Sequence, residues 1–436
     1  MKCESNSFIG RSVRCRRRLS IRSGVAAVLC FAFACMSGIA SAASIEYGGR
    51  ADVFLSLTPA CEFGIGIDCT GVSLLLTEDA FKTRFFAGLA SLKWGPGRNG
   101  PLCLSGHASP MPVMGYRLNK GRSEYVRFVG VMENDRKLLG HRLDFEVNPW
   151  LSIGVAETGI LSGDSCPLYY CPFPGLPLYA LQHVIYHRVR TQANDMNVNL
   201  ALDFTLDLKE LCAGRGWGEF GSTGQDAVRS PVSAEKNFML GTGFSTAICS
   251  SDIELYGEIL IDDAQFHLPN RSLVPDFVGC LVGLEIANSV GESKTIYNVE
   301  YALITNYVYS HRVPANSHTY LGVSLGHPLG PDADSLAVTV AHWPDRLTQL
   351  QFKAEFERHG QGRIGLSWSK EYGLEDIFLS GVVEKSARCS FVFERELMPH
   401  VFARTSMGMF NVTNHENIEG STYTGWSAST GVRLRL

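Results

Sequence analysis

A long series of alternating segments dominates this sequence. In stretches such as Met196–Leu206, Leu350–Arg358 and Thr422–Leu436, apolar and polar residues occupy alternate positions. Because successive side chains of a strand point to opposite faces, each such segment predicts a strand with one apolar and one polar face. Many strands of this kind with little helix between them favour a closed β-barrel, either in water or in an outer membrane.

The length of the chain favours the membrane barrel. No linker and no break in composition divides residues 43–436, and a single hydrophobic core rarely serves so long a segment. A membrane barrel escapes this limit because lipid, rather than a core, receives its outer face. The sequence therefore predicts an all-β fold, one antiparallel up-and-down transmembrane β-barrel of about 18 strands over residues 43–436. The expected strands include Phe238–Cys249, Thr319–Gly326, Ile364–Lys370 and Asp376–Lys385.

The N-terminus has the features of an export signal. A basic stretch precedes an apolar run from Gly24 to Ile39, and Ala40-Ser41-Ala42 supplies the small residues of a cleavage site. The apolar run is shorter than the ~20 residues that span a bilayer as a helix. We therefore expect residues 1–42 to be a cleaved signal peptide and the remaining chain to reach the cell outer membrane. An uncleaved anchor and a lipoprotein acylated at Cys35 are the alternatives.

Net charge limits the partners of the exported chain. Residues 1–42 hold seven of the 39 Lys and Arg residues and one of the 43 Asp and Glu residues, so 32 basic side chains remain with 42 acidic ones, a net charge near −10. Binding of nucleic acid, or of an anionic polymer in general, needs a basic face. Nucleic acid is therefore not an expected partner. Outer-membrane lipid is expected, and the chain is expected to be a monomer.

The cysteines predict at most a few loop disulfides. Cys166 and Cys171 lie close enough in the segment CPLYYC to close a small loop in an oxidising compartment, and they are the candidates for a disulfide. No cysteine pair or histidine has the spacing of a zinc site. Neither a metal nor a cofactor is expected.

Several motifs follow one another in a definite order. They are KWGPGRNGPLCLSGHASPMP from Lys93, ELYGEILIDDAQF from Glu254, Tyr309-Ser310-His311, and YLGVSLGHPLGPDADS from Tyr320. In this order they resemble the capsule assembly Wzi family of outer-membrane barrels, over roughly residues 80–345. The resemblance implies an eighteen-strand barrel that binds surface polysaccharide through its extracellular loops and tethers capsule to the cell.

Aromatic side chains in loops are the first candidates for sugar contacts, because their faces pack against the C–H surfaces of sugar rings. Trp94 follows a lysine and opens a Gly-Pro-Gly turn, and Tyr169, Tyr170 and Tyr179 lie in the segment from Cys166 to Tyr179. Each of these rings also has a plain structural interpretation, as an aromatic of the barrel lumen or of the membrane interface.

Paired carboxylates are the second group of candidates. Asp332 and Asp334 in the turn GPDAD offer oxygens to sugar hydroxyls or to a cation, and a turn that caps itself is the alternative. Asp262 and Asp263 end an alternating segment and offer the same contacts. With His267 they also contain the groups of a general acid–base pair, which leaves an outer-membrane hydrolase as one alternative function.

Other enzyme motifs are unconvincing. The letters GxGxxG occur at 216–221 and 360–365, but neither stretch joins a strand to a helix, as a dinucleotide site requires. The GxSxG letters around Ser324 lie within an alternating segment rather than at a strand-to-helix turn. We therefore expect a non-enzymatic barrel that binds surface or capsular polysaccharide. A porin-like channel for small solutes is the main alternative.

Overall fold

The structure, a computed structural model, describes most of the chain. The described residues are 43–47, 51–58, 61–67, 71–78, 81–163, 167–170, 177–178, 180–181, 196–214, 252–262, 277–366, 368 and 377–434. They form two compact units, which divide after Asp79. The expected signal peptide, residues 1–42, and the expected strand Phe238–Cys249 lie outside the described residues.

The first unit is an antiparallel meander of four strands. They are β1 (Ala43–Tyr47), β2 (Ala51–Thr58), β3 (Cys61–Ile67) and β4 (Gly71–Glu78). Each pairs with the next along the chain, as in the register Val53↔Ile65 between β2 and β3.

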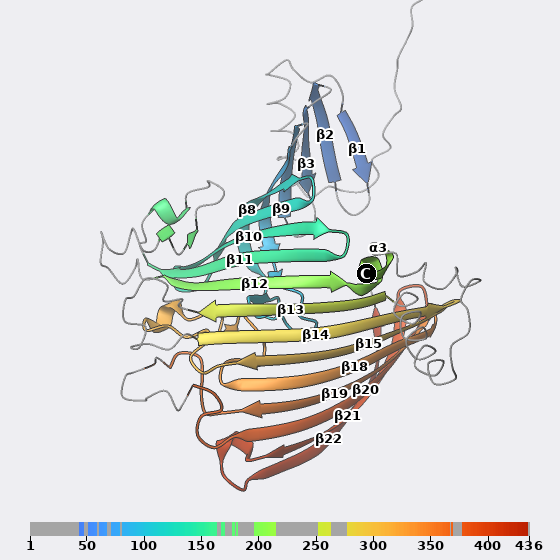
Figure 1. Ribbon diagram of the computed structural model, residues 1–436. Coiled ribbons are helices and arrows are strands. Elements are labelled where there is room, and N and C mark those ends of the chain that lie inside the picture. Colours follow the sequence, from blue (N-terminus) through green and yellow to red (C-terminus); the bar gives the residue numbers. More distant parts are fainter. Residues whose placement is uncertain are drawn as a thin grey trace, which may run out of the picture. The chain divides into compact units, whose positions relative to one another are not determined.

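The second unit is an antiparallel sheet of fourteen strands, each paired with the next of them along the chain (Figure 1). The strands are β5 (Phe81–Ala90), β8 (Met111–Lys120), β9 (Ser123–Val131), β10 (Arg136–Asn148), β11 (Leu151–Ser162), β12 (Asn197–Asp207), β13 (Asp252–Asp262), β14 (Phe277–Val290), β15 (Ser293–Ile304), β18 (Ala333–Asp345), β19 (Thr348–His359), β20 (Glu384–Met398), β21 (Val401–Thr413) and β22 (Thr422–Leu434). Most have 9 to 14 residues, enough to cross a bilayer when tilted.

The prediction of an all-β, antiparallel fold is confirmed. Apart from four strands of two residues each, the described residues form eighteen strands. The chain also contains the helix α3 (Leu208–Gly214) and the short 3-10 helices η1 (Pro167–Tyr170), η5 (Pro314–Asn316) and η7 (His415–Asn417). Within the described ranges, no helix is long and apolar enough to cross a membrane.

Three of the expected strands are wrong. Residues 319–326 form only the short hairpin of β16 (Thr319–Tyr320) and β17 (Val323–Ser324), because Leu321 and Gly322 between them have positive φ angles of 50° and 79°. The described part of Ile364–Lys370 is a turn with Gly365 at φ 97°, and the segment from Asp376 becomes a strand only at Glu384, after Gly381 at φ 64°. A left-handed backbone interrupts a strand whatever its side-chain pattern.

The connections of the large sheet differ at its two edges. At one edge, which we call the short-turn edge, two-residue turns join strands, as at Pro149-Trp150, Gly291-Glu292 and Arg346-Leu347. At the opposite, long-loop edge, residues 91–110, 305–332 and 360–383 form the connections. The connection from β12 to β13 is also long, although it leaves from the short-turn edge. In outer-membrane barrels the longer loops are extracellular.

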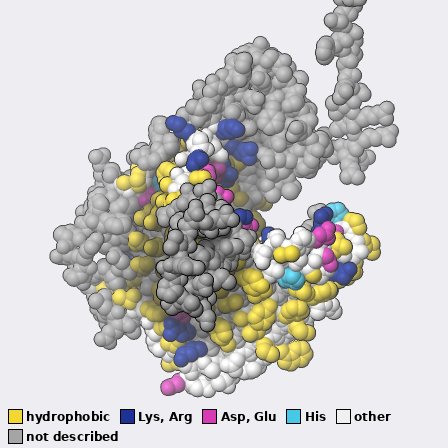
Figure 2. Space-filling model, turned by 45° about the vertical axis from the view of Figure 1, so that its right-hand side comes forward, with side chains coloured by type: hydrophobic (Ala, Val, Ile, Leu, Met, Phe, Trp, Pro, Cys, Tyr) yellow, Lys and Arg dark blue, Asp and Glu magenta, His cyan; other side chains and the backbone are white. Residues whose placement is uncertain are grey.

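The two faces of the large sheet differ in their surroundings. Residues 91–110 and 305–332 pack against one face, which we call the inner face. The outer face exposes large apolar side chains. Among them are Phe145, Val155, Leu202, Ile259, Val282, Val299, Leu336, Phe352, Phe356, Phe391 and Met407. Figure 2 shows hydrophobic side chains over much of the described surface in that view, with charged side chains gathered apart from them. Such a face suits contact with lipid.

Candidate functional site

Two loops from the long-loop edge fold back against the inner face. The first inner loop, residues 91–110, contains the short hairpin of β6 (Lys93–Trp94) and β7 (Leu104–Ser105); the second inner loop, residues 305–332, contains η5, β16 and β17. Both loops contribute buried side chains to one hydrophobic cluster, which also includes residues of β13, β14 and β15. A backbone hydrogen bond of 2.8 Å from the Ser105 N–H to the Leu325 carbonyl joins the two loops directly.

A tight turn at Trp94–Gly97 brings the first inner loop to the sheet. Gly95 has a φ of 116°, and a Cβ on it would lie 2.5 Å from Oε2 of Glu258, so only glycine fits. The Trp94 ring is half-buried and meets Phe128 edge-on, with 5.0 Å between the ring centroids. The aromatic-Gly-Pro-Gly motif therefore shapes the first inner loop.

Glu258 of β13 holds the next part of this loop. Its carboxylate is buried and accepts hydrogen bonds of 2.8 Å from the backbone N–H groups of both Leu102 and Cys103. Such hydrogen bonds contribute about 0.5–1.5 kcal/mol each. Because this carboxylate lies on the inner face, it holds the first inner loop against β13.

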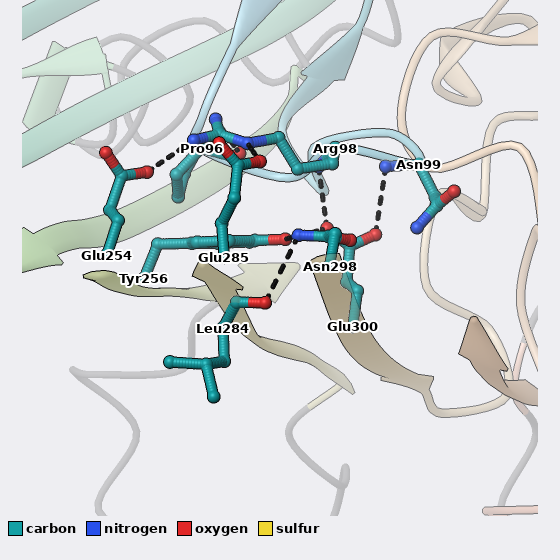
Figure 3. Close-up of polar contacts among 9 residues, drawn as sticks. All are labelled: Pro96, Arg98, Asn99, Glu254, Tyr256, Leu284, Glu285, Asn298 and Glu300. Carbon is teal, nitrogen blue, oxygen red and sulfur yellow. Dashed lines mark hydrogen bonds and ion pairs between the residues drawn. The ribbon is translucent and has the colours of Figure 1, made fainter. Parts of the chain in front are cut away.

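Arg98 lies among acidic side chains of three neighbouring strands (Figure 3). Its guanidinium donates to Glu254 of β13 and, at 2.9 Å, to Glu285 of β14. Glu300 of β15 accepts the backbone N–H groups of Arg98 at 2.6 Å and Asn99 at 3.0 Å. These contacts span residues from three strands, so they fix the loop both along the strands and across them.

Tyr256 completes this cluster from the floor of the site (Figure 3). Its hydroxyl donates to Glu300 at 2.9 Å and accepts from the Asn298 amide at 2.8 Å. The Arg98 guanidinium lies over the Tyr256 ring, 4.9 Å from its centroid, in cation–π geometry. Among the described residues the carboxylates, the guanidinium and the Tyr256 hydroxyl satisfy one another, whereas the buried Nδ2 of Asn99 has no partner.

Tyr309 anchors the second inner loop. Its backbone N–H donates to the buried carboxylate of Asp262 at 2.5 Å, and its buried hydroxyl donates to the Leu102 carbonyl at 2.8 Å and accepts from the His327 N–H at 3.1 Å. The ring stacks on His318, with 5.6 Å between centroids and 19° between planes. Burial raises the pKa of the Tyr309 hydroxyl, which stays protonated as the donor.

Two buried histidines support the same loop. His318 contacts the Cys103 carbonyl at 3.0 Å through Nε2, and the His327 Nδ1 accepts the Leu329 N–H at 3.2 Å. Burial lowers the pKa of His318 and of His327 to about 4. Both rings are therefore neutral at neutral pH, and the acceptor role of the His327 Nδ1 requires a neutral ring.

The structure gives Asp332 and Asp334 separate partners. Asp332 is fully buried and accepts the Gly362 N–H at 2.8 Å and the Ser380 hydroxyl at 2.6 Å, so it ties the second inner loop to residues 360–383. Asp334 instead pairs with Arg358 of β19, at 2.5 Å and 3.0 Å. The two carboxylates are not arranged as one cation site.

The remaining candidate residues fall into two groups. Tyr169 is fully buried, its carbonyl accepts from Arg127 Nη2 at 3.1 Å, and Tyr170 packs against the same small cluster. Outside the described residues lie Tyr179, Asp263, His267, Cys166 and Cys171.

Polar side chains on the inner face of the strands are the sequence signal for these loop anchors. Glu254, Tyr256, Glu258, Asn298 and Glu300 all occupy positions on the face of the strands that the loops contact. Polar side chains at such positions in an alternating segment indicate contacts within the lumen. Among the described residues, no group of three or more His, Cys, Asp and Glu side chains is placed to hold a metal ion.

Comparisons with known proteins support the fold. No family model and no curated protein matches this sequence. Among solved structures it is similar to Wzi of Escherichia coli, described as an outer membrane protein involved in group 1 capsule assembly and a carbohydrate-binding β-barrel. The TM-score is 0.52 at 13% identity, over 96% of this chain and 89% of that chain. OccD3 and OpdL of Pseudomonas aeruginosa match with TM-scores of 0.42 and 0.40, identities of 9% and 8%, and coverage of 89% and 90% of this chain and 86% and 90% of theirs.

The likeness to Wzi and the apolar outer face agree on the class of protein. A likeness at this identity shows the fold, and an exposed apolar face opposite a polar one is the pattern of strands that cross a membrane. The chain is therefore an outer-membrane β-barrel.

Proposed function

We propose that this barrel binds a surface polysaccharide and helps to attach or assemble it at the cell surface, with no chemical step of its own. The observation that carries the proposal is the pair of inner loops, which carboxylates of β13 and β15 tie to the inner face. Loops held in this way occupy lumen space and lose little freedom on binding, which suits a polymer-binding rim better than an open channel. The description of Wzi as a carbohydrate-binding barrel supports the same function.

The proposed contacts lie at the long-loop edge. Trp94 and Tyr170 are half-buried and offer ring surface, and Tyr179 lies in the same segment as Tyr170. Tyr169 and Asp332 are fully buried, so in this proposal they hold the loops on which the contacts lie.

Polymer retention by the refolded protein tests this function. Residues 166–179 are replaced by a Gly/Ser linker of equal length, and the same replacement of residues 414–421, another connection at the long-loop edge, is the matched control. We expect the first variant to lose binding of purified cell-surface polysaccharide and the control to retain it. Equal retention by wild type and both variants would leave the barrel without this function.

A solute channel is the second candidate, and one observation favours it. Arg388, Arg404 and Arg433 on the inner face of β20, β21 and β22 keep nearly half of their side-chain surface exposed, next to Glu357 and Glu394. Part of the inner face is therefore polar and open to water, as in a channel. A large, steady current in planar bilayers, together with no polymer binding, would favour the channel.

A further inference from the structure

A cavity opens on the outer face of the large sheet, close to the long-loop edge. Its volume is about 400 Å³, and its lining includes Tyr301, Leu336, Phe356, Arg358 and Lys385. The strand register places these side chains on one face, since Tyr301 pairs with Leu336, Leu336 with Phe356, and Arg358 with Lys385. Because Leu336 and Phe356 are exposed apolar side chains of the outer face, the cavity faces the lipid and not the lumen.

The cavity has an apolar floor and a charged rim. On the outer face, the row of side chains closest to the long-loop edge contains Asp334, Arg358 and Lys385. The next row of the same face, farther from that edge, contains Tyr301, Leu336 and Phe356. Below it the outer face remains apolar, as at Val299 and Val338. The cavity thus lies at the boundary between hydrocarbon and the polar surface.

The position of this boundary is confirmed by the outer face of β20. Its outward residues run from Lys385 through uncharged side chains to Arg395. The ten residue steps from Lys385 to Arg395 extend over about 33 Å along the strand, or about 25 Å along a barrel axis at the usual tilt. That is the height of the apolar band in outer-membrane barrels, so the two cations mark its two limits.

The rim carries an excess of positive charge. The Asp334 carboxylate accepts hydrogen bonds from Nε and Nη2 of Arg358, and from the Tyr301 hydroxyl at 2.9 Å. These contacts fix the Arg358 guanidinium and leave some of its five N–H groups for a ligand. Within the described part of the chain, no hydrogen bond or ion pair of the Lys385 ammonium is found. On the outer face two cations therefore oppose one carboxylate, on a chain whose overall net charge is −4. The Glu357 side chain also lines the cavity, but its carboxylate accepts hydrogen bonds from Arg388 at 2.6 Å and Ser386 at 3.1 Å on the inner face.

We propose that this cavity binds the phosphorylated headgroup of a lipid in the outer leaflet. Arginine and lysine are the side chains that bind phosphate oxygens, and a fixed guanidinium does so with little loss of freedom. The apolar floor continues into the apolar band, where acyl chains lie. A polysaccharide at the cell surface reaches the charged rim but would have to enter the hydrocarbon to cover the apolar floor, so the charge and the apolar floor together favour a lipid.

Lipid binding by the refolded full chain in phosphatidylcholine nanodiscs tests the site. The probe is a bisphosphorylated glucosamine lipid, compared with its dephosphorylated form and with inorganic phosphate, and bound lipid is counted by native mass spectrometry. Lys385→Gln is the test variant, because this exposed side chain makes no contact that the fold needs. Arg395→Gln is the matched control, since Arg395 lies on the same strand and face at the opposite limit of the band.

We expect Lys385→Gln to weaken binding of the phosphorylated lipid by about tenfold, which corresponds to the loss of one charge-assisted contact. Arg395→Gln is expected to bind the phosphorylated lipid as wild type does. The dephosphorylated lipid is expected to bind wild type more weakly than the phosphorylated lipid does. The proposal is overturned by equal affinity of Lys385→Gln and wild type, by an equal loss in both variants, or by equal binding of the dephosphorylated lipid. It is also overturned if inorganic phosphate binds as tightly as the lipid. Polysaccharide retention by Lys385→Gln is expected to match wild type, so the two functions can fail separately.

Discussion

Replacement of Tyr309 by phenylalanine tests how the two inner loops hold each other. The buried Tyr309 hydroxyl joins the Leu102 carbonyl, at 2.8 Å, to the His327 N–H, at 3.1 Å. Tyr309→Phe keeps the ring and adds no charge, but both backbone groups lose this partner. A neutral hydrogen bond contributes about 0.5–1.5 kcal/mol, and a buried group left without a partner costs about 1–3 kcal/mol. The expected loss of loop stability is therefore about 2 kcal/mol.

Such a loss corresponds to an about 30-fold larger population of open loops. Hydrogen–deuterium exchange measures it directly, because opening exposes the loop amides. Peptides that cover residues 97–105 and 322–330 are expected to exchange about 30-fold faster in Tyr309→Phe, and peptides of β20 and β21 at the wild-type rate. Tyr297→Phe is the control, because Tyr297 is an exposed side chain of the outer face. Wild-type exchange rates in both loop segments of Tyr309→Phe would refute the argument.

Three further predictions concern the same loops. Gly95→Ala should lower the stability of the barrel in thermal unfolding by about 2 kcal/mol or more, since Gly95 has a φ of 116° and the new Cβ would lie 2.5 Å from a carboxylate oxygen. Gly291→Ala is the control and should cost only about 1 kcal/mol, because Gly291, at φ 63°, has open space around it. Acidification from pH 6.5 to about 4 should loosen the second inner loop, because burial lowers the pKa of His318 and His327 to about 4 and the unfolded chain then binds more protons than the folded one. Proteolysis of residues 305–332 that stays constant over this range would contradict it. Arg98→Ala should raise the conductance in planar bilayers, because the first inner loop loses its side-chain contacts with Glu254 and Glu285, although Glu258 still holds its backbone. An unchanged current would count against the anchoring role of Arg98.

The alternation of side chains predicted many of the strands in which every second residue lies on the outer face. The segment Leu350–Arg358 lies inside β19, for example. The same pattern missed β8, because Pro112 and Gly115 are rare within strands. Gly115 is required there, since a Cβ on it would lie 2.2 Å from the Arg127 carbonyl. The reason for such a residue lies in a neighbouring strand, which a local pattern does not include.

The motifs were found in the sequence, but their contacts were not. Glu258 accepts hydrogen bonds from residues 155 and 156 positions away, and Tyr309 donates to a carbonyl 207 positions away. Carboxylates and aromatic rings in loops suit both sugar binding and loop anchoring, and only the register of the strands decides which groups meet. The inner position of Asp262 follows from that register, and the burial of Asp332 follows from its contacts with Gly362 and Ser380 in another loop.

The anchoring role of these motifs bears on the proposed function. A loop that is free before binding must be ordered by the polymer, and each ordered side chain costs about 0.5–1.5 kcal/mol of affinity. Glu258, Glu300 and Asp262 accept hydrogen bonds from loop N–H groups, so the loops are already ordered when the protein has folded. If the polymer binds on these loops, Tyr309→Phe should therefore weaken polymer binding although Tyr309 is buried and contacts no polymer. If the barrel is instead a channel, Tyr309→Phe should change its conductance, because the inner loops are looser, and there is no polymer binding for the substitution to weaken.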